Sequence, residues 1–359
     1  MKARPHPRAS DLGMAGDITD MKPLLALVAG GARLDLAQAE TAFDILMSGN
    51  ATPSQIGAFL MALRIRGETV EEVTAAARTM RAKMTRVKAP ARAIDIVGTG
   101  GDASGSLNIS TGAALVVAGC GVPVAKHGNR ALSSRSGAAD TLGALGVNID
   151  CEIPLIERAI REANIGFMMA PRFHSATRHV AGTRVELGTR TIFNLLGPLS
   201  NPASVKRLLV GVYDQRWVTP VAQVLANLGA VRAWVVHGSD GLDELTTTGP
   251  SYVAELRSGK VRSFEVKPED AGLKRALPAD LKGGTPDQNA AAMSAMLAGR
   301  HGPFRDIVLY TAAAALVIAG KAGDLQRGVA LGAEAIDRGR ARAALDKMVR
   351  ITNMKAKSA

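Results

Sequence analysis

Strand and helix patterns alternate from about residue 94 onward, and this feature limits the possible folds more than any other in the chain. The apolar run Ile94–Val97 predicts a short strand that ends in a glycine-rich turn, and a helix is expected from Ser110 to about Ala118. A second strand is expected over Val122–Ala125. Parallel strands need crossover connections, which helices usually supply. The alternation therefore predicts an α/β fold with a largely parallel sheet flanked by helices.

The same alternation continues toward the end of the chain. A capped helix opens at Thr285–Gln288, and the pattern is helical from there to about residue 350. Further strands are expected at Gly166–Ala170, Leu208–Val212, Ala233–His237, Tyr252–Leu256 and Val261–Val266. These elements extend the predicted sheet well beyond its first two strands.

The chain before residue 90 lacks strand signals and instead carries helix-start patterns. Thr52–Gln55 combines an N-cap, a proline at the first helical position and a glutamine that can close a capping box, and Thr69 with Glu72 repeats the device. An apolar face follows the first start, formed by Ile56, Phe59, Leu60 and Leu63. We expect an all-helical unit of about four helices here.

These patterns divide the chain into three parts. The stretch from about residue 180 to 200 has a helix-like pattern that ends in Gly197-Pro198, and we assign it to the first helical unit. The predicted parts are a loose leader over 1–18, a small helical domain over 19–90 plus about 180–200, and a large α/β domain over 91–179 plus 201–359.

The chain is strongly basic, with 44 Lys and Arg against 32 Asp and Glu, a net charge of +12. Such an excess can attract a polyanion such as a nucleic acid. Aromatic residues make up only 3% of the chain and are not interleaved with the basic ones, as stacking on single strands would require. We therefore expect solvated basic surface and no nucleic-acid partner.

The cysteine content and the length of the apolar runs indicate in which cellular compartment the protein is expected. Only Cys120 and Cys151 are present, without a CxxC pair or a zinc-type spacing, which favours a reducing environment. The first residues lack the apolar core of a signal peptide, and apolar runs such as Ala312–Ala319 are too short to cross a bilayer. The prediction is a soluble cytoplasmic protein with no membrane association.

The glycine-rich segment Gly98–Asp102, GTGGD, is the first of three loops that carry chemistry. Glycines let backbone amides approach a phosphate, and a helix that begins near Ser110 directs free N–H groups at the same anion. The segment is neither the GxxxxGK[ST] nucleotide loop nor the GxGxxG dinucleotide turn. A tight turn without any ligand is the alternative when this loop is considered alone.

The second loop follows the next strand. Lys126–Arg130, KHGNR, is followed by Ser133–Gly137, SSRSG, so cations, an amide and hydroxyls gather where open α/β sheets bind ligands. Surface charges and simple helix caps are the alternative reading. The third loop holds Asp243 and Glu244, just beyond a predicted strand. Adjacent carboxylates suit magnesium bound to a diphosphate, although two solvated acids would also fit the pattern.

Five motifs in this order and spacing resemble the anthranilate phosphoribosyltransferases. They are GTGGD, NIST, KHGNR with SSRSG, RTIFNLLGPLSNP over Arg190–Pro202, and DEL over Asp243–Leu245. The resemblance covers about residues 20 to 350 and implies a fold similar to the pyrimidine nucleoside phosphorylases, with a small helical and a larger α/β domain. One departure precedes Asn108, where Ser106 and Leu107 stand in place of the Thr-Phe pair of many relatives.

The resemblance also implies the site residues and the cofactor. Residues that match the phosphoribosyl pyrophosphate site are Gly98, Gly101, Asp102, Ser106, Asn108, Ile109, Ser110, Thr111, Lys126, His127, Gly128, Asn129, Arg130, Ala131, Leu132, Ser133, Ser134 and Ala138. Those that match the anthranilate site are Gly98, Asn129 and Arg184. Those that match the ligands of the implied cofactor, Mg2+, are Ser110, Asp243 and Glu244.

Catalytic roles are expected for Lys126, His127 and Arg184. A guanidinium such as that of Arg184 suits a benzoate carboxylate through paired hydrogen bonds. His127 is the candidate for proton transfer, although an aromatic amine can attack with its own lone pair and needs no strong base. Positioning and fixed charge directed at the leaving pyrophosphate would then supply most of the acceleration.

Two other functions fit parts of the pattern. A pyrimidine nucleoside phosphorylase would need a pyrimidine-reading site in place of Asn129 and Arg184, and a non-catalytic nucleic-acid-binding relative would need a contiguous basic face. The intact motifs favour the transferase. The resemblance further implies small-molecule substrates, anthranilate and phosphoribosyl pyrophosphate, a homodimer formed through the helical domain, and a place in tryptophan biosynthesis.

Overall fold

The computed structural model describes residues 20–102, 104–131 and 135–355, and the expected leader over 1–18 lies outside these residues. The described chain forms two compact units, each built from two separate segments. The helical unit contains the residues up to Met84 together with His174–Ser200, and the α/β unit contains Thr85–Phe173 together with the chain from Asn201 onward.

Capping boxes open the main helices of the helical unit, as the sequence predicts. The Thr52 amide donates to Gln55 Oε1 at 2.9 Å and the Gln55 amide to Thr52 Oγ1 at 3.3 Å, and the expected apolar face that follows is buried. The helices of this unit are α1 (Met21–Ala29), α2 (Leu36–Met47), α3 (Pro53–Arg66), α4 (Val70–Ala82), the 3₁₀ turn η2 (Ser175–Thr177), α9 (Arg178–Leu187) and α10 (Phe193–Leu199).

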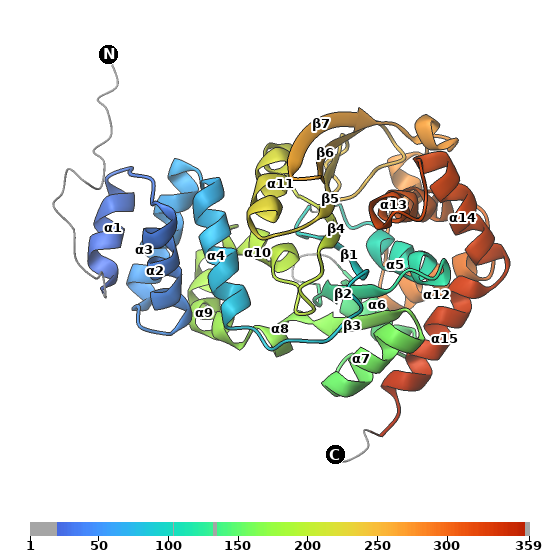
Figure 1. Ribbon diagram of the computed structural model, residues 1–359, viewed down its shortest axis with the longest axis horizontal. Helices are drawn as coiled ribbons and strands as arrows, with labels where there is room; N and C mark the ends of the chain where they lie inside the picture. The colour runs from blue at the N-terminus through green and yellow to red at the C-terminus, as the bar shows by residue number, and fades with distance from the viewer. Residues whose placement is uncertain (1–19, 103, 132–134, 356–359) are drawn as a thin grey trace. The chain divides into compact units, whose positions relative to one another are not determined.

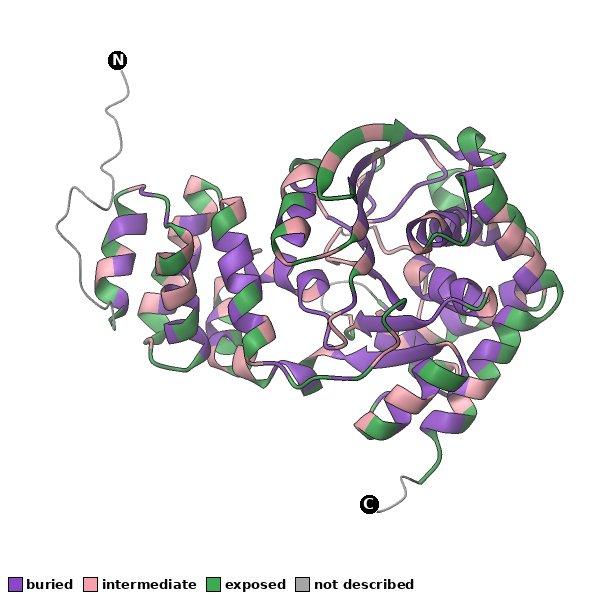
Figure 2. Ribbon diagram, in the orientation of Figure 1, coloured by how far each residue is buried: buried purple, intermediate pink, exposed green. Residues whose placement is uncertain are grey.

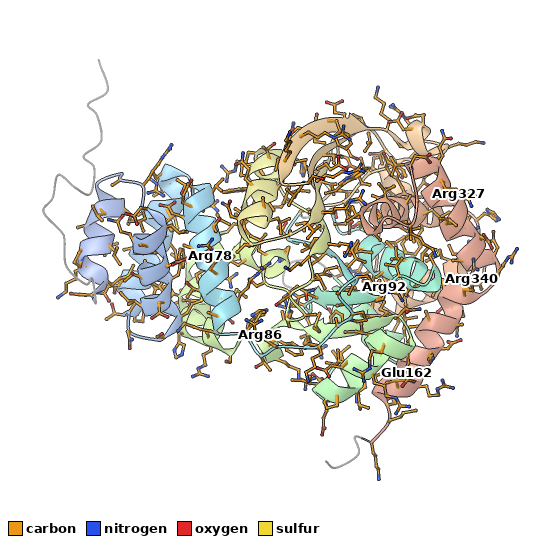
Figure 3. All side chains as sticks on the ribbon, in the orientation of Figure 1. Arg78, Arg86, Arg92, Glu162, Arg327 and Arg340 are labelled. Atoms are coloured by element: carbon orange, nitrogen blue, oxygen red, sulfur yellow. The ribbon has the colours of Figure 1, made fainter. Side chains whose placement is uncertain are left out.

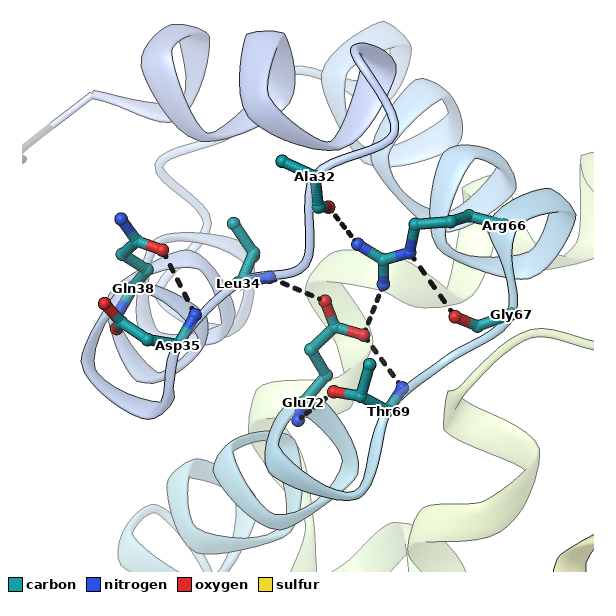
Figure 4. A network of polar contacts seen from close by, with 8 residues as sticks. All are labelled: Ala32, Leu34, Asp35, Gln38, Arg66, Gly67, Thr69 and Glu72. Carbon is teal, nitrogen blue, oxygen red and sulfur yellow. Dashed lines mark hydrogen bonds and ion pairs between the residues drawn. The ribbon is translucent and has the colours of Figure 1, made fainter. Parts of the chain in front are cut away.

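The second capping box does more than start a helix, because its glutamate ties three segments together (Figure 4). Glu72 is fully buried and accepts hydrogen bonds from the amides of Thr69 at 2.9 Å and Leu34 at 3.1 Å. Its carboxylate also pairs with the guanidinium of Arg66, which in turn donates to the carbonyl of Ala32. One side chain therefore joins the end of α3, the start of α4 and the loop before α2.

Replacing Glu72 with alanine is expected to lower the free energy of unfolding by about 3 kcal/mol, because it leaves a guanidinium and two amides without their buried acceptor. Denaturant unfolding followed by circular dichroism measures this loss. The neighbouring Glu71 is exposed, so Glu71→Ala is the matched control and should change stability little. Equal effects in the two variants would contradict the role given to Glu72.

The α/β unit contains the predicted strands and the helices between them (Figure 1). The strands are β1 (Ile94–Gly98), β2 (Val124–Gly128), β3 (Ile165–Met169), β4 (Arg207–Gly211), β5 (Arg232–Gly238), β6 (Ser251–Arg257) and β7 (Lys260–Val266). The helices are α5 (Ile109–Gly119), α6 (Ala138–Ala144), α7 (Ile153–Glu162), α8 (Ala170–Phe173), α11 (Val218–Asn227), α12 (Pro286–Leu297), α13 (Pro303–Ala319), α14 (Leu325–Asp337) and α15 (Arg340–Thr352). Short 3₁₀ turns lie at η3 (Gln215–Trp217), η4 (Pro268–Ala271) and η5 (Pro278–Leu281).

The sheet is mixed but largely parallel, which confirms the predicted fold class. Its order is β3-β2-β1-β4-β5-β6-β7, in which β1 to β5 run parallel and β6 and β7 are antiparallel to their neighbours. The apolar helices α5 and α13 pack on the sheet and share a core with it, and α11 packs on β5 to β7. The strands of the parallel part are mostly buried (Figure 2). Parallel strands covered in this way are expected to be apolar along their length.

A row of like charges crosses the amino-terminal edge of the parallel strands. Arg207 is the register partner of Arg232, Arg232 of Arg257, and Arg257 of Lys260, so these cations extend from one face of four neighbouring strands. Burial lowers the pKa of Arg232, and the charges of Arg257 and Arg207 lower it further while Glu255 opposes them. Like charges directly opposite each other on a sheet are destabilising.

Arg257→Glu is therefore expected to raise the free energy of unfolding by about 0.5 to 1 kcal/mol at low salt, since it replaces two repulsive pairs with attractive ones. The gain should shrink as salt is added, because these side chains are at the surface. Arg257→Gln removes the repulsion only and should give a smaller gain. A loss of stability in Arg257→Glu at low salt would show that the row is not repulsive.

Several basic residues near the C-terminus, among them Arg338, Arg340 and Arg342, are exposed, as expected for solvated basic surface. Arg340 pairs with Glu334 at 3.3 Å and Arg342 with Asp346 at 2.8 Å. Figure 3 shows Arg327 and Arg340 extending from α14 and α15. Within the described part of the chain, none of the helices combines the length and the apolar character needed to cross a lipid bilayer.

Candidate functional site

The three predicted loops begin at one edge of the sheet. β1 ends at Gly98, β2 at Gly128 and β5 at Gly238, and these parallel strands point in the same direction. The strand order reverses between β1 and β4, since the chain runs from β1 to β2 on one side and from β4 to β5 on the other (Figure 1). Open α/β sheets bind ligands at the carboxyl ends of the strands at such a reversal.

Asp243 lies directly against the first loop. Its Oδ2 accepts a hydrogen bond from the amide of Gly100 at 2.7 Å, and its own amide donates to Asp102 Oδ2 at 3.5 Å. A Cβ on Gly98 would stand 2.3 Å from Asp243 Oδ2, and a Cβ on Gly211 only 1.5 Å from the Asp243 carbonyl oxygen. Glycine at these two strand ends is therefore required for the Asp243 loop to reach the GTGGD turn.

Glu244 extends this contact to the start of α5. Its Oε1 accepts from the amide of Ser110 at 3.1 Å, so the carboxylate occupies the amino end of the helix. The Lys126 ammonium donates to Ser110 Oγ at 3.4 Å and to the Ile96 carbonyl at 2.7 Å. The first and third loops, the start of α5 and the end of β2 are thus joined through Asp243, Glu244, Ser110 and Lys126.

The electrostatics of this group favour an added cation. Burial raises the pKa of Asp243 to about 7, with Asp102 as a further cause. Burial also raises the pKa of Glu244 to about 8, and the charge of Asp243 adds to that effect. Burial lowers the pKa of Lys126, although the charges of Asp95, Glu244 and Asp243 oppose the shift. Carboxylates that repel one another in a buried place are stabilised in their charged form by a bound cation.

The donor set fits a magnesium ion. Magnesium takes oxygen ligands, usually one or two carboxylates together with substrate phosphates. Asp243 and Glu244 supply the carboxylates, and the hydroxyl of Ser110 is hydrogen-bonded to Glu244. No group of three or more His, Cys, Asp or Glu in the described residues is arranged to hold a metal ion alone, so substrate phosphates would have to complete the coordination.

Asn108 connects the start of α5 to the second loop. Its Oδ1 accepts from Asn289 Nδ2 at 2.9 Å and from the Thr141 hydroxyl, and its Nδ2 donates to the Ser136 carbonyl at 3.3 Å. The hydroxyl of Thr111 is buried without a hydrogen-bond partner among the described residues. The start of α5 therefore combines a fixed amide side chain with a hydroxyl that a ligand could engage.

Ile109, a predicted binding residue, is the first residue of α5. Its side chain is buried with Leu242, Leu281 and Ile307, so only its main chain is available to a ligand. Ser106 lies in a short bridge with Lys282, and Gly101 adopts a φ of 75°, a left-handed conformation that favours glycine.

The second loop is held by a carboxylate that the sequence did not single out. Asp140 accepts from the amides of Ala131 at 3.0 Å and Gly137 at 2.9 Å, and it pairs with Arg130 at 3.1 Å. Asn129 is exposed and accepts from the Arg130 amide. Arg130 thus forms an ion pair with a residue of α6. Ala138 begins α6. The predicted contacts of Leu132, Ser133 and Ser134 lie outside the described residues.

Lys126 and His127 are strand residues, and not loop residues, because β2 extends to Gly128 beyond the predicted end at Ala125. Successive side chains of a strand point to opposite faces of the sheet. The Lys126 side chain is on the face of α5, where it contacts Ser110, so the His127 side chain is on the other face. Both are buried. The side chains of the two predicted catalytic residues therefore extend from opposite faces of the sheet.

Arg184 belongs to the helical unit, on α9. Its guanidinium lies over the ring of Phe193, 5.4 Å from the centroid, and burial lowers its pKa. An arginine stacked on an aromatic ring is held in place and keeps its in-plane donors for a carboxylate.

Asp95 and Asn201 have no predicted role in the site, although Asn201 lies within the Arg190–Pro202 motif. Both are fully buried, and Asn201 Nδ2 donates to Asp95 Oδ2 at 2.7 Å. Burial raises the pKa of Asp95 to about 6, while Lys126, Asn201 and two backbone amides oppose the shift. The available signal was a charged residue in the middle of an otherwise apolar strand.

Comparisons with known proteins agree with this architecture. The profile described as "Glycosyl transferase family, a/b domain" matches residues 90–342, and "Glycosyl transferase family, helical bundle domain" matches residues 22–84. Anthranilate phosphoribosyltransferase from Azospirillum brasilense is 63% identical over 338 residues, 94% of this chain and 95% of the relative. That from Rhodospirillum rubrum is 63% identical over 332 residues, 92% of this chain and 96% of the relative.

Solved structures show the same similarity. The crystal structure of anthranilate phosphoribosyltransferase from Thermus thermophilus superposes with a TM-score of 0.88 at 43% identity, covering 92% of this chain and 99% of that one. The Saccharomyces cerevisiae enzyme in complex with phosphoribosyl pyrophosphate and magnesium gives a TM-score of 0.83 at 27% identity, covering 93% and 99%.

A helical bundle combined with an α/β unit whose loops gather glycines, a lysine and paired carboxylates defines a glycosyltransferase. Within this class, the relatives that are more than 60% identical over nearly the whole chain are anthranilate phosphoribosyltransferases. The chain belongs to the anthranilate phosphoribosyltransferase family.

Proposed function

We propose that the chain transfers the phosphoribosyl group of phosphoribosyl pyrophosphate to the amino group of anthranilate, giving N-(5-phosphoribosyl)anthranilate and pyrophosphate. The observation that carries the proposal is the junction of the first and third loops with the start of α5 and the end of β2, through Asp243, Glu244, Ser110 and Lys126. It supplies backbone amides, a cation and metal-binding carboxylates at one edge of the sheet, which is what a magnesium-bound diphosphate requires. The family's activity supports the assignment.

The phosphoribosyl pyrophosphate would be held by the GTGGD turn, the start of α5 and the KHGNR loop. Amides and hydroxyls of these segments bind phosphate oxygens, and the helix start contributes its positive dipole end. Magnesium held by Asp243, Glu244 and Ser110 would neutralise the diphosphate. The amides of Gly100 and Ser110 donate to the two carboxylates, so substrate phosphates would compete for these donors.

Lys126 is proposed to stabilise negative charge on the departing pyrophosphate. Its ammonium is buried and fixed by two hydrogen bonds, so little reorganisation is needed when charge develops on the leaving group. Arg184 and Asn129 are proposed to bind anthranilate, the guanidinium through its carboxylate. The anthranilate nitrogen would attack C1 of the ribose with inversion and lose its proton afterwards, so no strong base is assigned.

The decisive test mixes the purified protein with anthranilate, phosphoribosyl pyrophosphate and magnesium and follows the loss of anthranilate fluorescence. Loss is expected only when all three are present, and it should stop when a chelator removes the magnesium. A protein that leaves anthranilate untouched under these conditions would refute the proposal. Phosphorolysis of uridine with inorganic phosphate would instead identify a pyrimidine nucleoside phosphorylase.

The helical unit is proposed to form a homodimer. Ile65 on α3 and Val185 on α9 are each 81% exposed, and α3 packs against α9, so we propose these apolar side chains as part of the interface. Light scattering should give about twice the chain mass of 37.3 kDa. The double variant Ile65→Lys/Val185→Lys should be monomeric, whereas Leu277→Lys, at a 68% exposed leucine of the α/β unit, should remain a dimer. A monomeric wild-type protein would exclude the proposal.

The predicted cytoplasmic location is likewise a proposal, which follows from the reducing environment that the cysteine content favours. Cell fractionation with an antibody to the chain tests it.

A further inference from the structure

The backbone hydrogen bonds between β1 and β2 stop after the first residue pair. Over these two strands, both described in full, only Ile94 and Val124 are register partners, whereas β1 with β4 and β2 with β3 pair along their whole length. A parallel ladder continued from that pair would join the Ile96 amide to the Ala125 carbonyl and the His127 amide to the Ile96 carbonyl. These bonds are replaced by side-chain contacts.

The Asp95 carboxylate accepts hydrogen bonds from the backbone amides that the missing ladder would have paired. Its Oδ1 accepts from the amide of His127 at 3.1 Å, and the amide of Ile96 also donates to its carboxylate. Asn201 Nδ2 donates to the other oxygen at 2.7 Å. The carboxylate thus stands between the two strands in place of a carbonyl from either.

Lys126 and Asn201 donate hydrogen bonds to the backbone carbonyls that the missing ladder would have paired. The Lys126 ammonium donates to the Ile96 carbonyl at 2.7 Å, and Asn201 Nδ2 donates to the Ala125 carbonyl at 2.8 Å. Asn201 Oδ1 accepts from the amide of Ala203 at 2.8 Å, which fixes the orientation of its amide group. The four backbone groups of these two ladder bonds therefore each have a side-chain partner.

Burying these charged side chains has a large desolvation free energy, which stability alone does not explain. Asp95 is 0%, Asn201 1% and Lys126 2% exposed, so a carboxylate and an ammonium are both removed from water. Buried ion pairs are often no better for stability than apolar residues of the same size. An ordinary ladder between two apolar strands would satisfy the same backbone groups without burying charge.

We propose that Asp95 and Asn201 are positioning residues for Lys126, holding the carboxyl ends of β1 and β2 out of a regular ladder so that the ammonium is fixed beside Ser110 where the diphosphate binds. The inference rests on the proposed function. If the ladder were complete, the Ile96 carbonyl would accept from the His127 amide, and Lys126 would lose the contact that anchors its side chain between the two phosphate-binding loops.

The test is Asp95→Asn, which keeps the size of the side chain but sets an amide N–H₂ against that of Asn201. Calorimetric titration with phosphoribosyl pyrophosphate and magnesium should show affinity lowered roughly 100-fold, because a small displacement of a charge-stabilising group has an effect of that order. The apparent KM for anthranilate should not change. Glu255→Gln is the matched control, since Glu255 is a buried carboxylate of the same sheet that accepts from Trp234 and Arg262. It should leave both substrates unaffected.

A reciprocal exchange separates positioning from general damage. D95N/N201D restores an acceptor facing a donor and should recover part of the lost affinity. If Asp95→Asn does not fold, Asn201→Ser, which removes both amide donations and keeps the charge of Asp95, decides the question with the same titration. A folded variant that binds phosphoribosyl pyrophosphate like the wild type, or that weakens both substrates equally, would overturn the inference.

The inference and the proposed function can fail separately. Inorganic pyrophosphate with magnesium serves as a second probe, because it reports on Lys126 without any transfer reaction. A wild-type protein that binds pyrophosphate tightly but does not consume anthranilate would refute the function alone. An active wild-type enzyme whose Asp95→Asn variant binds pyrophosphate normally would refute the inference alone.

Discussion

The double variant Asp243→Ala/Glu244→Ala is expected to lose transfer activity by at least about 1000-fold, because fixed groups that stabilise transition-state charge each contribute 10²- to 10³-fold. Its fold should survive. Glu244 is buried and Asp243 is half-buried, and their pKa values are raised to about 8 and about 7, so the folded chain gains little from their charges. The measurements are anthranilate consumption and thermal unfolding in the same buffer.

The isosteric variant Asp243→Asn/Glu244→Gln serves as the control for shape. It keeps the size of both side chains and removes only the charge, so it should be as inactive as the alanine pair. Magnesium should also no longer strengthen the binding of phosphoribosyl pyrophosphate to either variant, since the metal would lack its protein carboxylates. Magnesium-dependent activity in either variant would contradict the metal assignment.

Gly211→Ala is expected to reduce activity roughly 100-fold by moving Asp243 relative to the first loop. A Cβ at this position would stand 1.5 Å from the Asp243 carbonyl oxygen, a backbone atom that cannot rotate away. The whole loop after β5 must shift, which breaks the hydrogen bond from the Gly100 amide to Asp243. Overpacking of this kind also destabilises by about 1 to 3 kcal/mol.

Gly143→Ala is the matched control in the same unit. Gly143 lies in α6, and no atom stands within 4 Å of the position of an added Cβ. Alanine in a helix is favoured over glycine, so this variant should be fully active and slightly more stable. Activity assays and denaturant unfolding on both variants check the pair, and a fully active Gly211→Ala protein would show that the Asp243 loop does not need its observed place.

The sequence predicts those features of the fold that depend on short stretches of chain. The capping boxes at Thr52 and Thr69, the strand at Ile94 and the three chemical loops could all be located from local patterns, and each is present. The carboxyl ends of parallel strands meet at one edge, so the meeting of the loops also followed once the sheet was predicted.

Features that depend on register between distant segments could not be predicted. The sequence pattern ends the second strand at Ala125 because Lys126 and His127 are polar, whereas in the structure buried partners allow both residues to continue β2. The need for glycine at position 211 depends on a loop that begins after the following strand. The role of Asp95 depends on Asn201, which is more than 100 positions further along the chain.

The helical unit is assembled from two segments, and this has a consequence for synthesis on the ribosome. The aromatic contact between Phe43 and Phe193 and the hydrogen bond from Arg81 to the Leu199 carbonyl both need the second segment. That segment emerges only after β1, β2 and β3 have left the exit tunnel. The apolar surfaces of the nascent amino-terminal helices therefore stay partly exposed while part of the α/β unit is synthesised. The speed of translation through this stretch is expected to affect the yield of native protein.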